Sequence, residues 1–365
     1  MRDGWGAQGG QGGNHRLFDA TWGFSPARGV IGHTGAGPPI PWAACTPSDD
    51  NPRVTEPTLA TREDILAAAK QLAPYLRTTP VVTVDRADLG LPGRAPLVLK
   101  LELVQHSGSF KARGAHLYLL GDAPPVGVVA ASGGNFGVAV AYAARRLDVP
   151  ATVFVPATSA PAKLDRLRSL GATVEVVPGY YDDALVASRT HADATGARFL
   201  HAFDQPEMIL GAGTLGAELA AQADVDRVVV AVGGSGLIGG VASWYRGDVA
   251  VTGVETAGCR TLSDALAAGH PVEVGIAGIG ADALGARRAG DLGFAAAQRW
   301  VDRVVVVEDE AVVDAQHRLW SALRLALEPA GAAALAALTT GALADPDERV
   351  AVVLCGANVD PATLA

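Results

Sequence analysis

The sequence predicts an α/β fold in which helices cover both faces of parallel β-sheets. Three observations support this: β-branched segments alternate with alanine-rich segments, the β-branched segments are apolar throughout, and glycine-rich turns follow several of them. The β-branched segments lie at 126–131, 151–155, 172–177, 227–232, 249–254, 303–307 and 349–354. Strands buried on both faces have such continuous apolar runs, and parallel strands need helical connections.

The N-terminal region differs in composition from the rest of the chain. Residues 1–57 are rich in Gly and Pro and lack helical or strand periodicity, which predicts a mostly unstructured extension. A start codon assigned too far upstream, or an interaction arm, would give the same pattern. Order is expected to begin at Thr61, which forms a capping box with Asp64. The helix that follows has an apolar face formed by Ile65, Leu66, Ala69, Leu72 and Leu76.

Composition excludes several classes of protein. The 365 residues are 49% hydrophobic and 18% charged, and the net charge of −9 does not favour nucleic acid or an anionic membrane as partner. No apolar run reaches the length of about 18 residues that spans a bilayer. Cys45, Cys259 and Cys355 fit neither a disulfide framework nor a metal site. We therefore expect a cytoplasmic protein with a small-molecule substrate.

Two glycine-rich turns are candidate anion sites, because ligands of parallel sheets bind beyond the carboxyl ends of strands. The turn SGGNFG at 132–137 follows the first β-branched segment and opens a helix, whose free N–H groups suit a carboxylate or phosphate. A tight turn that needs glycine would explain this segment equally well, although Asn135 favours a site. The turn GGSG at 233–236 lacks the lysine of a nucleotide-binding P-loop, so it predicts a site for the phosphate of a cofactor.

A third segment, LELVQHSGSFKARGA, places Lys111 beside Phe110 at the expected start of a helix. A single lysine in such a position is usually solvated. In a partly apolar site, however, a lysine loses its charge readily and becomes a nucleophile that can form an imine. Cys355, which follows the last β-branched segment, is by itself expected to be a buried structural thiol.

In this order, the four motifs resemble those of the fold-type II pyridoxal-phosphate (PLP) enzymes, and among these the threonine/serine dehydratases. The resemblance extends from near Thr61 to the C-terminus. Cysteine synthases of the same fold type have a different lysine motif. The most specific part is Q-x-S/T-G-S-F-K-x-R-G-A, matched by Gln105, Ser107, Gly108, Ser109, Phe110, Lys111, Arg113, Gly114 and Ala115.

The resemblance implies a role for each motif. Lys111 would hold PLP as an imine and act as base at Cα, and Asn135 would bind the phenolic oxygen of PLP. Cys355 would face the pyridine nitrogen; because a neutral thiol leaves the ring unprotonated, elimination is favoured over a long-lived carbanion. The implied cofactor site comprises Lys111, Phe110, Asn135, Gly233, Gly234, Ser235, Gly236, Leu237 and Cys355, with the Ser235 hydroxyl on the phosphate. The implied substrate site comprises Ser132, Gly133, Gly134, Asn135, Phe136, Gly137 and Ser109; Ser109 would equally serve as a helix cap.

Several positions depart from the family pattern. Phe136 replaces the usual His of S-x-G-N-H, which leaves the choice of substrate open. Gly133 replaces the serine that is the second base of serine racemases, which favours elimination. Glu255 matches one carboxylate of a divalent-cation site in racemase-like relatives, but Thr261 replaces its partner Asp. A metal ligand and an ordinary strand-end acid are therefore equal interpretations of Glu255. Glu328 is expected either near the cofactor ring or at a helix start, where the dipole favours an acid.

The resemblance also implies the architecture and the reaction. A large PLP-binding domain of residues 58–126 and 205–365 would contain an inserted smaller domain of residues 127–204, with PLP in the cleft. The resemblance also suggests a homodimer or a higher oligomer as the assembly. The expected reaction converts L-threonine or L-serine to 2-oxobutyrate or pyruvate and ammonia. The alternatives are racemisation, β-replacement or dehydration of 3-hydroxyaspartate, and a non-catalytic binding protein on the same scaffold. Because the chain ends soon after Asp360, no isoleucine-sensing C-terminal domain is expected.

Overall fold

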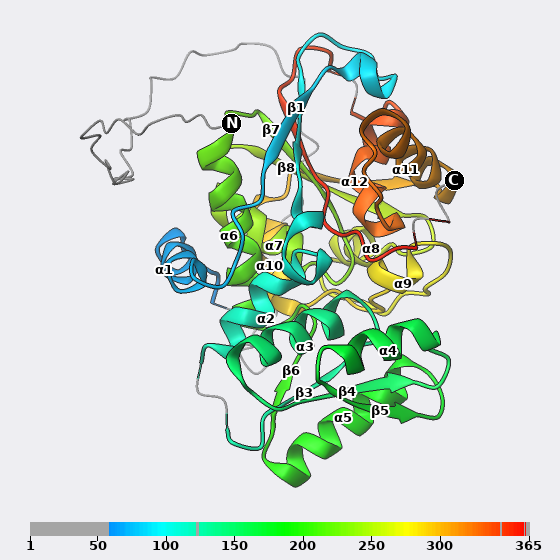
Figure 1. Cartoon of the computed structure of the whole chain (residues 1–365). Helices are drawn as coiled ribbons and strands as arrows, with labels where there is room; N and C mark the ends of the chain where they lie inside the picture. The colour runs from blue at the N-terminus through cyan, green and yellow to red at the C-terminus, as the bar shows by residue number, and fades with distance from the viewer. Residues whose placement is uncertain (1–57, 122–123, 344, 361, 363–365) are drawn as a thin grey trace, which may run out of the picture. The chain divides into compact units, whose positions relative to one another are not determined.

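Two β-sheets, one of six strands and one of four, form the framework of the computed structural model (Figure 1). The structure describes residues 58–365 except 122–123, 344, 361 and 363–365, so the extension predicted at 1–57 lies outside the described residues. All seven predicted strands are present, and they pair in parallel. The predicted α/β class with parallel sheets is therefore confirmed.

The six-stranded sheet has the order β1-β2-β10-β7-β8-β9. Only β1 runs antiparallel to its neighbour. Its strands are β1 (Val81–Val84), β2 (Leu97–Lys100), β7 (Arg227–Ala231), β8 (Ala250–Thr256), β9 (Arg303–Val307) and β10 (Val350–Val353). Every residue of β7 and β10 is buried, as expected for central strands covered on both faces.

Helices lie on both sides of this sheet. Figure 1 shows α6, α7 and α10 on one side and α11 and α12 on the other. The helices associated with the large sheet are α1 (Arg62–Leu72), α6 (Pro206–Gln222), α7 (Gly236–Tyr245), α8 (Thr261–Ala268), α9 (Ala281–Leu284), α10 (Asp291–Trp300), α11 (Asp309–Leu323) and α12 (Pro329–Thr339). Helix α12 consists mostly of buried alanines, which let it pack closely against β7 and β8.

The four-stranded sheet has the order β5-β4-β3-β6, and all its strands are parallel. Alternate residues of β4 face opposite helical layers: Val153 packs with α3 and α4, and Phe154 packs with α5. Figure 1 shows these helices above and below the sheet. The elements are β3 (Val128–Ala131), α3 (Asn135–Leu147), β4 (Ala151–Pro156), α4 (Pro161–Ser169), β5 (Thr173–Val177), α5 (Tyr181–Thr195) and β6 (Arg198–Leu200).

Helix α2 (Lys111–Leu119) connects the two halves of the structure. Its residues Ala115, Tyr118 and Leu119 pack in one cluster with β3 and α3, although the sequence assigned them to the large domain. Both sheets belong to one compact unit, Thr55–Ala365. All strands of the smaller sheet fall within 127–204, but the division into two domains stays a prediction.

The predicted capping box of α1 is confirmed. The Thr61 hydroxyl accepts from the Asp64 N–H at 3.1 Å, and the Asp64 carboxylate accepts from the Thr61 N–H at 3.0 Å. The predicted apolar face is wrong at Leu66, which is 45% exposed, because Ala68 turns inward with Ile65 and Leu72 instead.

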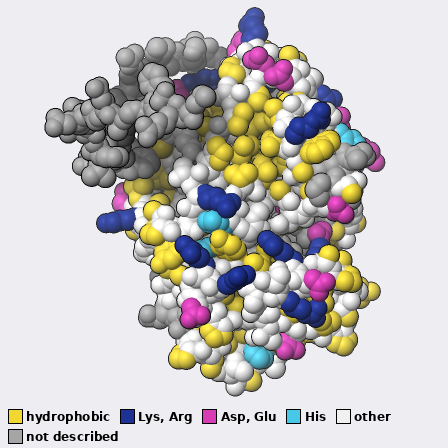
Figure 2. Space-filling model, in the orientation of Figure 1, with side chains coloured by type: hydrophobic (Ala, Val, Ile, Leu, Met, Phe, Trp, Pro, Cys, Tyr) yellow, Lys and Arg dark blue, Asp and Glu magenta, His cyan; other side chains and the backbone are white. Residues whose placement is uncertain are grey.

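The surface carries charges of both signs. On the face in Figure 2, basic side chains (dark blue) and acidic ones (magenta) are interspersed with hydrophobic side chains (yellow). Among the described helices, none combines the length and apolar character needed to cross a membrane.

Candidate active site

The predicted motifs meet at one cavity of about 980 Å³, which lies at the carboxyl ends of β3, β7 and β10. Strands β7 and β10 pair in the large sheet and β3 lies in the small one, so the carboxyl ends of strands from both sheets bring together turns that are far apart in the sequence. The predicted residues that line the cavity are Phe110, Lys111, Ser132, Gly133, Gly134, Asn135, Phe136, Gly233, Gly234, Ser235, Gly236, Leu237, Glu328 and Cys355. Gly137 and Ser109 are not among the lining residues.

Lys111 is the first residue of α2, and its amine is held in an apolar environment. Its Nζ donates to the Ala202 carbonyl at 2.6 Å and lies 5.1 Å from the ring centre of Phe110 and 5.8 Å from that of Phe136. Burial lowers the pKa of Lys111 to about 8, and this effect outweighs the opposite influence of Cys355. Near neutral pH, part of the amine is therefore uncharged and nucleophilic.

The turn at 233–236 presents free N–H groups to the cavity. Among the described residues, no acceptor is bound by the N–H groups of Gly233, Gly234 or Ser235, and α7 has no side-chain cap. A Cβ at Gly234 would overlap the ring of Phe203, so only glycine permits this close approach. Free N–H groups at a helix N-terminus suit an anion, and the predicted phosphate site stays a prediction.

The side chain of Ser235 has a hydrogen-bond partner within the turn. The residue has a left-handed backbone with φ of 66°, and its hydroxyl donates to the Gly234 carbonyl at 2.6 Å. In this structure the side chain therefore stabilises the turn. Because a hydroxyl has one proton, donation to a phosphate would require leaving this bond, and it stays a prediction.

The SGGNFG turn begins α3, which also lacks a side-chain cap. Within the described residues, the N–H groups of Gly133, Asn135 and Phe136 have no acceptor, whereas that of Gly134 donates to the Ser132 hydroxyl at 3.2 Å. Such a helix end favours a carboxylate.

Two residues of this turn also have structural roles. A Cβ at Gly137 would overlap the Ser132 carbonyl oxygen, so the tight turn requires glycine there, and a contact with substrate stays a prediction. Phe136 is 3% exposed and packs in the core with Tyr118 and Leu119, and it also lines the cavity, with its ring centre 5.8 Å from Lys111 Nζ.

Asn135 links two further polar residues. Its Nδ2 donates to Glu328 Oε1 at 2.5 Å, and its Oδ1 accepts from Asn358 Nδ2. Burial raises the pKa of Glu328 to about 7, although the bond from Asn135 lowers it. Glu328 also directly precedes α12, as one of the two interpretations expects, and it lines the cavity; a position near the cofactor ring stays a prediction.

Cys355 lies at the end of the cavity that β10 forms. Its thiol is 4% exposed, and Sγ lies 3.4 Å from the Ala330 carbonyl. Burial and the neighbouring Glu328 raise the pKa of Cys355 above its usual range. The thiol is therefore neutral; its one proton is donated to the Ala330 carbonyl in this structure and would have to turn to reach a ring nitrogen.

Ser109 and Glu255 have no contact with this cavity. Ser109 is fully buried, and its hydroxyl has no hydrogen-bond partner among the described residues, so it neither lines the site nor caps α2. The buried carboxylate of Glu255 accepts from the N–H groups of Leu262 and Ser263 at 2.5 and 3.0 Å, and from the Ser263 hydroxyl at 2.6 Å. Thr261 donates to the Ala286 carbonyl at 2.6 Å.

Glu255 therefore caps α8, which favours the interpretation as a strand-end acid. Burial raises its pKa. In the described part of the chain, no three or more His, Cys, Asp or Glu side chains are grouped as metal ligands would be. A divalent cation stays a prediction.

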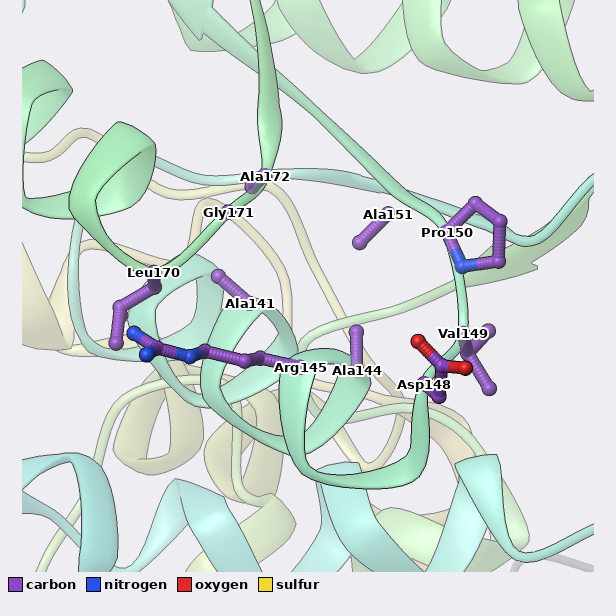
Figure 3. A pocket seen from close by; sticks show the side chains of 10 residues that line it. All are labelled: Ala141, Ala144, Arg145, Asp148, Val149, Pro150, Ala151, Leu170, Gly171 and Ala172. Atoms are coloured by element: carbon purple, nitrogen blue, oxygen red, sulfur yellow. The ribbon is translucent and has the colours of Figure 1, made fainter.

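The segment His201–Asp204 was not identified from the sequence, although it lines the cavity and follows β6. Ala202 holds the Lys111 amine, and Phe203 packs under the glycine turn. A second cavity of about 310 Å³, lined by Arg145, Asp148 and Leu170 among others, contains none of the predicted residues (Figure 3).

Comparison with known proteins identifies the family. Residues 72–356 match the family described as pyridoxal-phosphate dependent enzyme. The chain belongs to this family. The predicted PLP cofactor and the assignment to fold-type II are thereby confirmed.

Individual relatives are by name a dehydratase, an ammonia-lyase and a racemase. Phenylserine dehydratase of Ralstonia pickettii is 38% identical over 320 residues, covering 85% of this chain and 96% of that protein. L-threonine ammonia-lyase of Geobacter sulfurreducens is 35% identical over 277 residues, which cover 74% of this chain and 69% of that protein. The structure of maize serine racemase has a TM-score of 0.78 and 30% identity, covering 84% of this chain and 96% of that one.

The residues of the cavity fit PLP. Uncapped N–H groups at 233–235 suit its phosphate, the neutral Cys355 thiol suits an unprotonated ring nitrogen, and Lys111 can attack its aldehyde.

Proposed function

We propose that the protein removes water from 2-amino-3-hydroxy acids, with L-threonine and L-serine as substrates, and releases a 2-oxo acid and ammonia. The observation that carries this proposal is the environment of Lys111, whose amine has a lowered pKa, lies near two aromatic rings and shares its cavity with the two glycine-rich turns. Bound PLP would supply an aldehyde that joins to amines and a ring that withdraws electrons from the adjoining carbon.

The residues of this chain divide the work among them. Lys111, with a pKa of about 8, would remove the proton at Cα. The N–H groups at the start of α3 would hold the substrate carboxylate, and Asn135 would donate to the phenolic oxygen of PLP. The neutral thiol of Cys355 donates a hydrogen bond and no proton, which favours loss of the β-hydroxyl.

An aromatic β-substituent is a second candidate. The relative from Ralstonia pickettii is by name a phenylserine dehydratase, and Phe110, Phe136 and Tyr181 line the cavity of this chain. We propose that 3-phenylserine is accepted as well, because its ring can pack against these side chains.

The deciding experiment is a substrate panel. Purified protein with PLP is given L-threonine, L-serine, 3-phenylserine and 3-hydroxyaspartate, and both 2-oxo acid and ammonia are measured. Equal amounts of the two products from threonine or serine are expected. If serine changes its configuration while none of the four yields an oxo acid, the enzyme is a racemase and the proposal is wrong.

We further propose a homodimer in the cytoplasm. The resemblance to the dehydratases supports the dimer, and the free, buried thiols of Cys259 and Cys355 suit a reducing compartment. Sedimentation of the purified protein tests the assembly: a monomeric species at micromolar concentration would contradict it.

A further inference from the structure

The side-chain amide of Asn135 lies between two groups that fix its orientation. Its Nδ2 donates to the Glu328 carboxylate, and its Oδ1 accepts from the Nδ2 of Asn358. A half-turn of the amide would place its NH2 group against that of Asn358 and its oxygen against the carboxylate. When Glu328 is ionised, and so can only accept, the two neighbours therefore allow only one orientation.

Asn358 is itself held in place. Its Nδ2 also donates to the Ser107 carbonyl at 3.1 Å, so both of its amide protons are used. A Cβ at Gly108 would lie 2.7 Å from Asn358 Oδ1, and a Cβ at Gly356 would overlap the Glu328 carboxylate. Glycines at these two positions make room for both neighbours of the Asn135 amide.

One N–H bond of Asn135 is left for a ligand. Its Nδ2 has two protons, and within the described residues only Glu328 accepts one of them. Asn135 lines the cavity, whereas Asn358 is exposed and does not. Asn358 contacts a lining residue directly at Asn135, and its second bond is to Ser107, which lies four residues before Lys111.

We propose that Asn358 is a positioning residue, which keeps the second N–H of Asn135 directed at the phenolic oxygen of PLP. Without the donor on Oδ1, the amide turns over and presents its oxygen where the N–H should be. The inference rests on the proposed contact between Asn135 and PLP.

The test uses Asn358→Asp, which replaces a donor by an acceptor of almost the same size. Protein freed of PLP is titrated with PLP, and its visible absorption is followed against pH. We expect the dissociation constant of PLP to rise about tenfold, as for the loss of one hydrogen bond. The phenolic oxygen should also keep its proton to a pH about one unit higher, because the donor that favours its charged form is lost.

Asn358→Ala covers the case in which the Asp variant does not fold. It leaves both orientations of Asn135 open, so PLP binding should weaken by only about twofold. The proposal is overturned if Asn358→Asp binds PLP with wild-type affinity and has wild-type absorption. If the Asp variant does not fold, the same result in Asn358→Ala overturns it.

A double variant separates positioning from a merely structural role. The double variant combines Asn358→Asp with Glu328→Gln. The new Asp can accept from the turned NH2 group of Asn135, and the new Gln can donate to its turned oxygen. The Tm lost in Asn358→Asp should therefore recover, whereas PLP affinity and the pH dependence of absorption should stay altered. Recovery of both would show that Asn358 only stabilises the fold, and Glu328→Gln alone is the control. Since no amino acid is added, failure of threonine or serine turnover leaves this test unaffected.

Discussion

Two basic side chains on α2, two residues apart, lie in opposite environments. Arg113 is 2% exposed and donates to Glu102 at 2.9 and 2.6 Å, to Glu218 at 3.0 Å and to Thr214 at 3.2 Å. Lys111, on the cavity side, has one carbonyl oxygen as partner. Paired carboxylates raise the pKa of Arg113 above its usual range, whereas burial without a carboxylate lowers that of Lys111.

The Arg113 side is a closed network of charges. Lys100, fully buried, donates to Glu218 at 2.6 Å, to Gln222 at 2.7 Å and to the Thr79 carbonyl at 2.8 Å. The cations Lys100 and Arg113 thus form ion pairs with the carboxylates of Glu102 and Glu218. One helix thus carries a cation that stays charged in the core and an amine that can lose its proton in the cavity. The carboxylates beside Arg113, and their absence beside Lys111, favour this difference.

The largest expected effect follows from removing the cavity-side amine. Lys111→Ala should lower kcat/KM by at least about 10³-fold, because the nucleophile and base are lost together. The absorption band of covalently attached PLP should disappear, while the Tm stays within a few degrees of wild type. A band that persists in this variant would refute the assignment of Lys111.

Removing the core-side charge should act on stability instead. Arg113→Ala leaves Glu102 and Glu218 without their main partner, so the free energy of unfolding should fall by about 3–5 kcal/mol. Arg94→Ala is the control, since its pair with Asp347 is exposed and worth at most about 1 kcal/mol. Urea unfolding measures both, and equal losses in the two variants would contradict the comparison.

Glu328 is a carboxylate on the cavity side, and its pKa is raised, whereas the pKa of Glu218 in the core network is lowered. Its pKa of about 7 exceeds the ordinary 4.5, so the folded protein retains a proton that the unfolded chain releases. Stability therefore falls as the pH rises from about 4.5 to 7. Glu328→Gln removes this loss and should be more stable than wild type above pH 7, by about 3 kcal/mol, with no difference below pH 4.5.

Urea unfolding of the cofactor-free proteins at several pH values measures this difference. Burial lowers the pKa of His116 and of His201 to about 4, which changes stability in the opposite direction between pH 4 and 6.5. Both histidines are present in wild type and variant, so the difference between the two curves reports Glu328. Parallel curves would show that Glu328 ionises normally.

The core-side network explains which strands could not be read from the sequence. The central strands were predictable because both of their faces are apolar. Strand β2 ends at Lys100, whose partner Glu218 lies far along the chain, so a buried lysine interrupts the apolar pattern. Strand β1 packs at the edge and is largely exposed.

The cavity side was predictable where a recognised strand precedes the turn. Strand β6 has only three residues, Arg198–Leu200, and was missed, so the segment His201–Asp204 at its carboxyl end was missed with it. Asn358 follows Cys355 by three residues, but its role depends on a contact with Asn135 that no local pattern encodes. The sequence thus identifies groups at strand ends, while their hydrogen-bond partners require the structure.

The smallest expected effect concerns charges at the mouth of the cavity, which are exposed, unlike those around Arg113. Lys163 on α4 pairs with Asp282 on α9, and both residues line the cavity. Asp282→Asn should raise KM by about twofold to fivefold at low salt and leave kcat unchanged, because an exposed pair is worth about 0.2–1 kcal/mol and is screened by salt. Asp165→Asn is the matched control, since its pair with Arg168 lies within α4. An equal change in KM for both variants would mean that the Lys163–Asp282 pair affects substrate binding no more than an ion pair within one helix does.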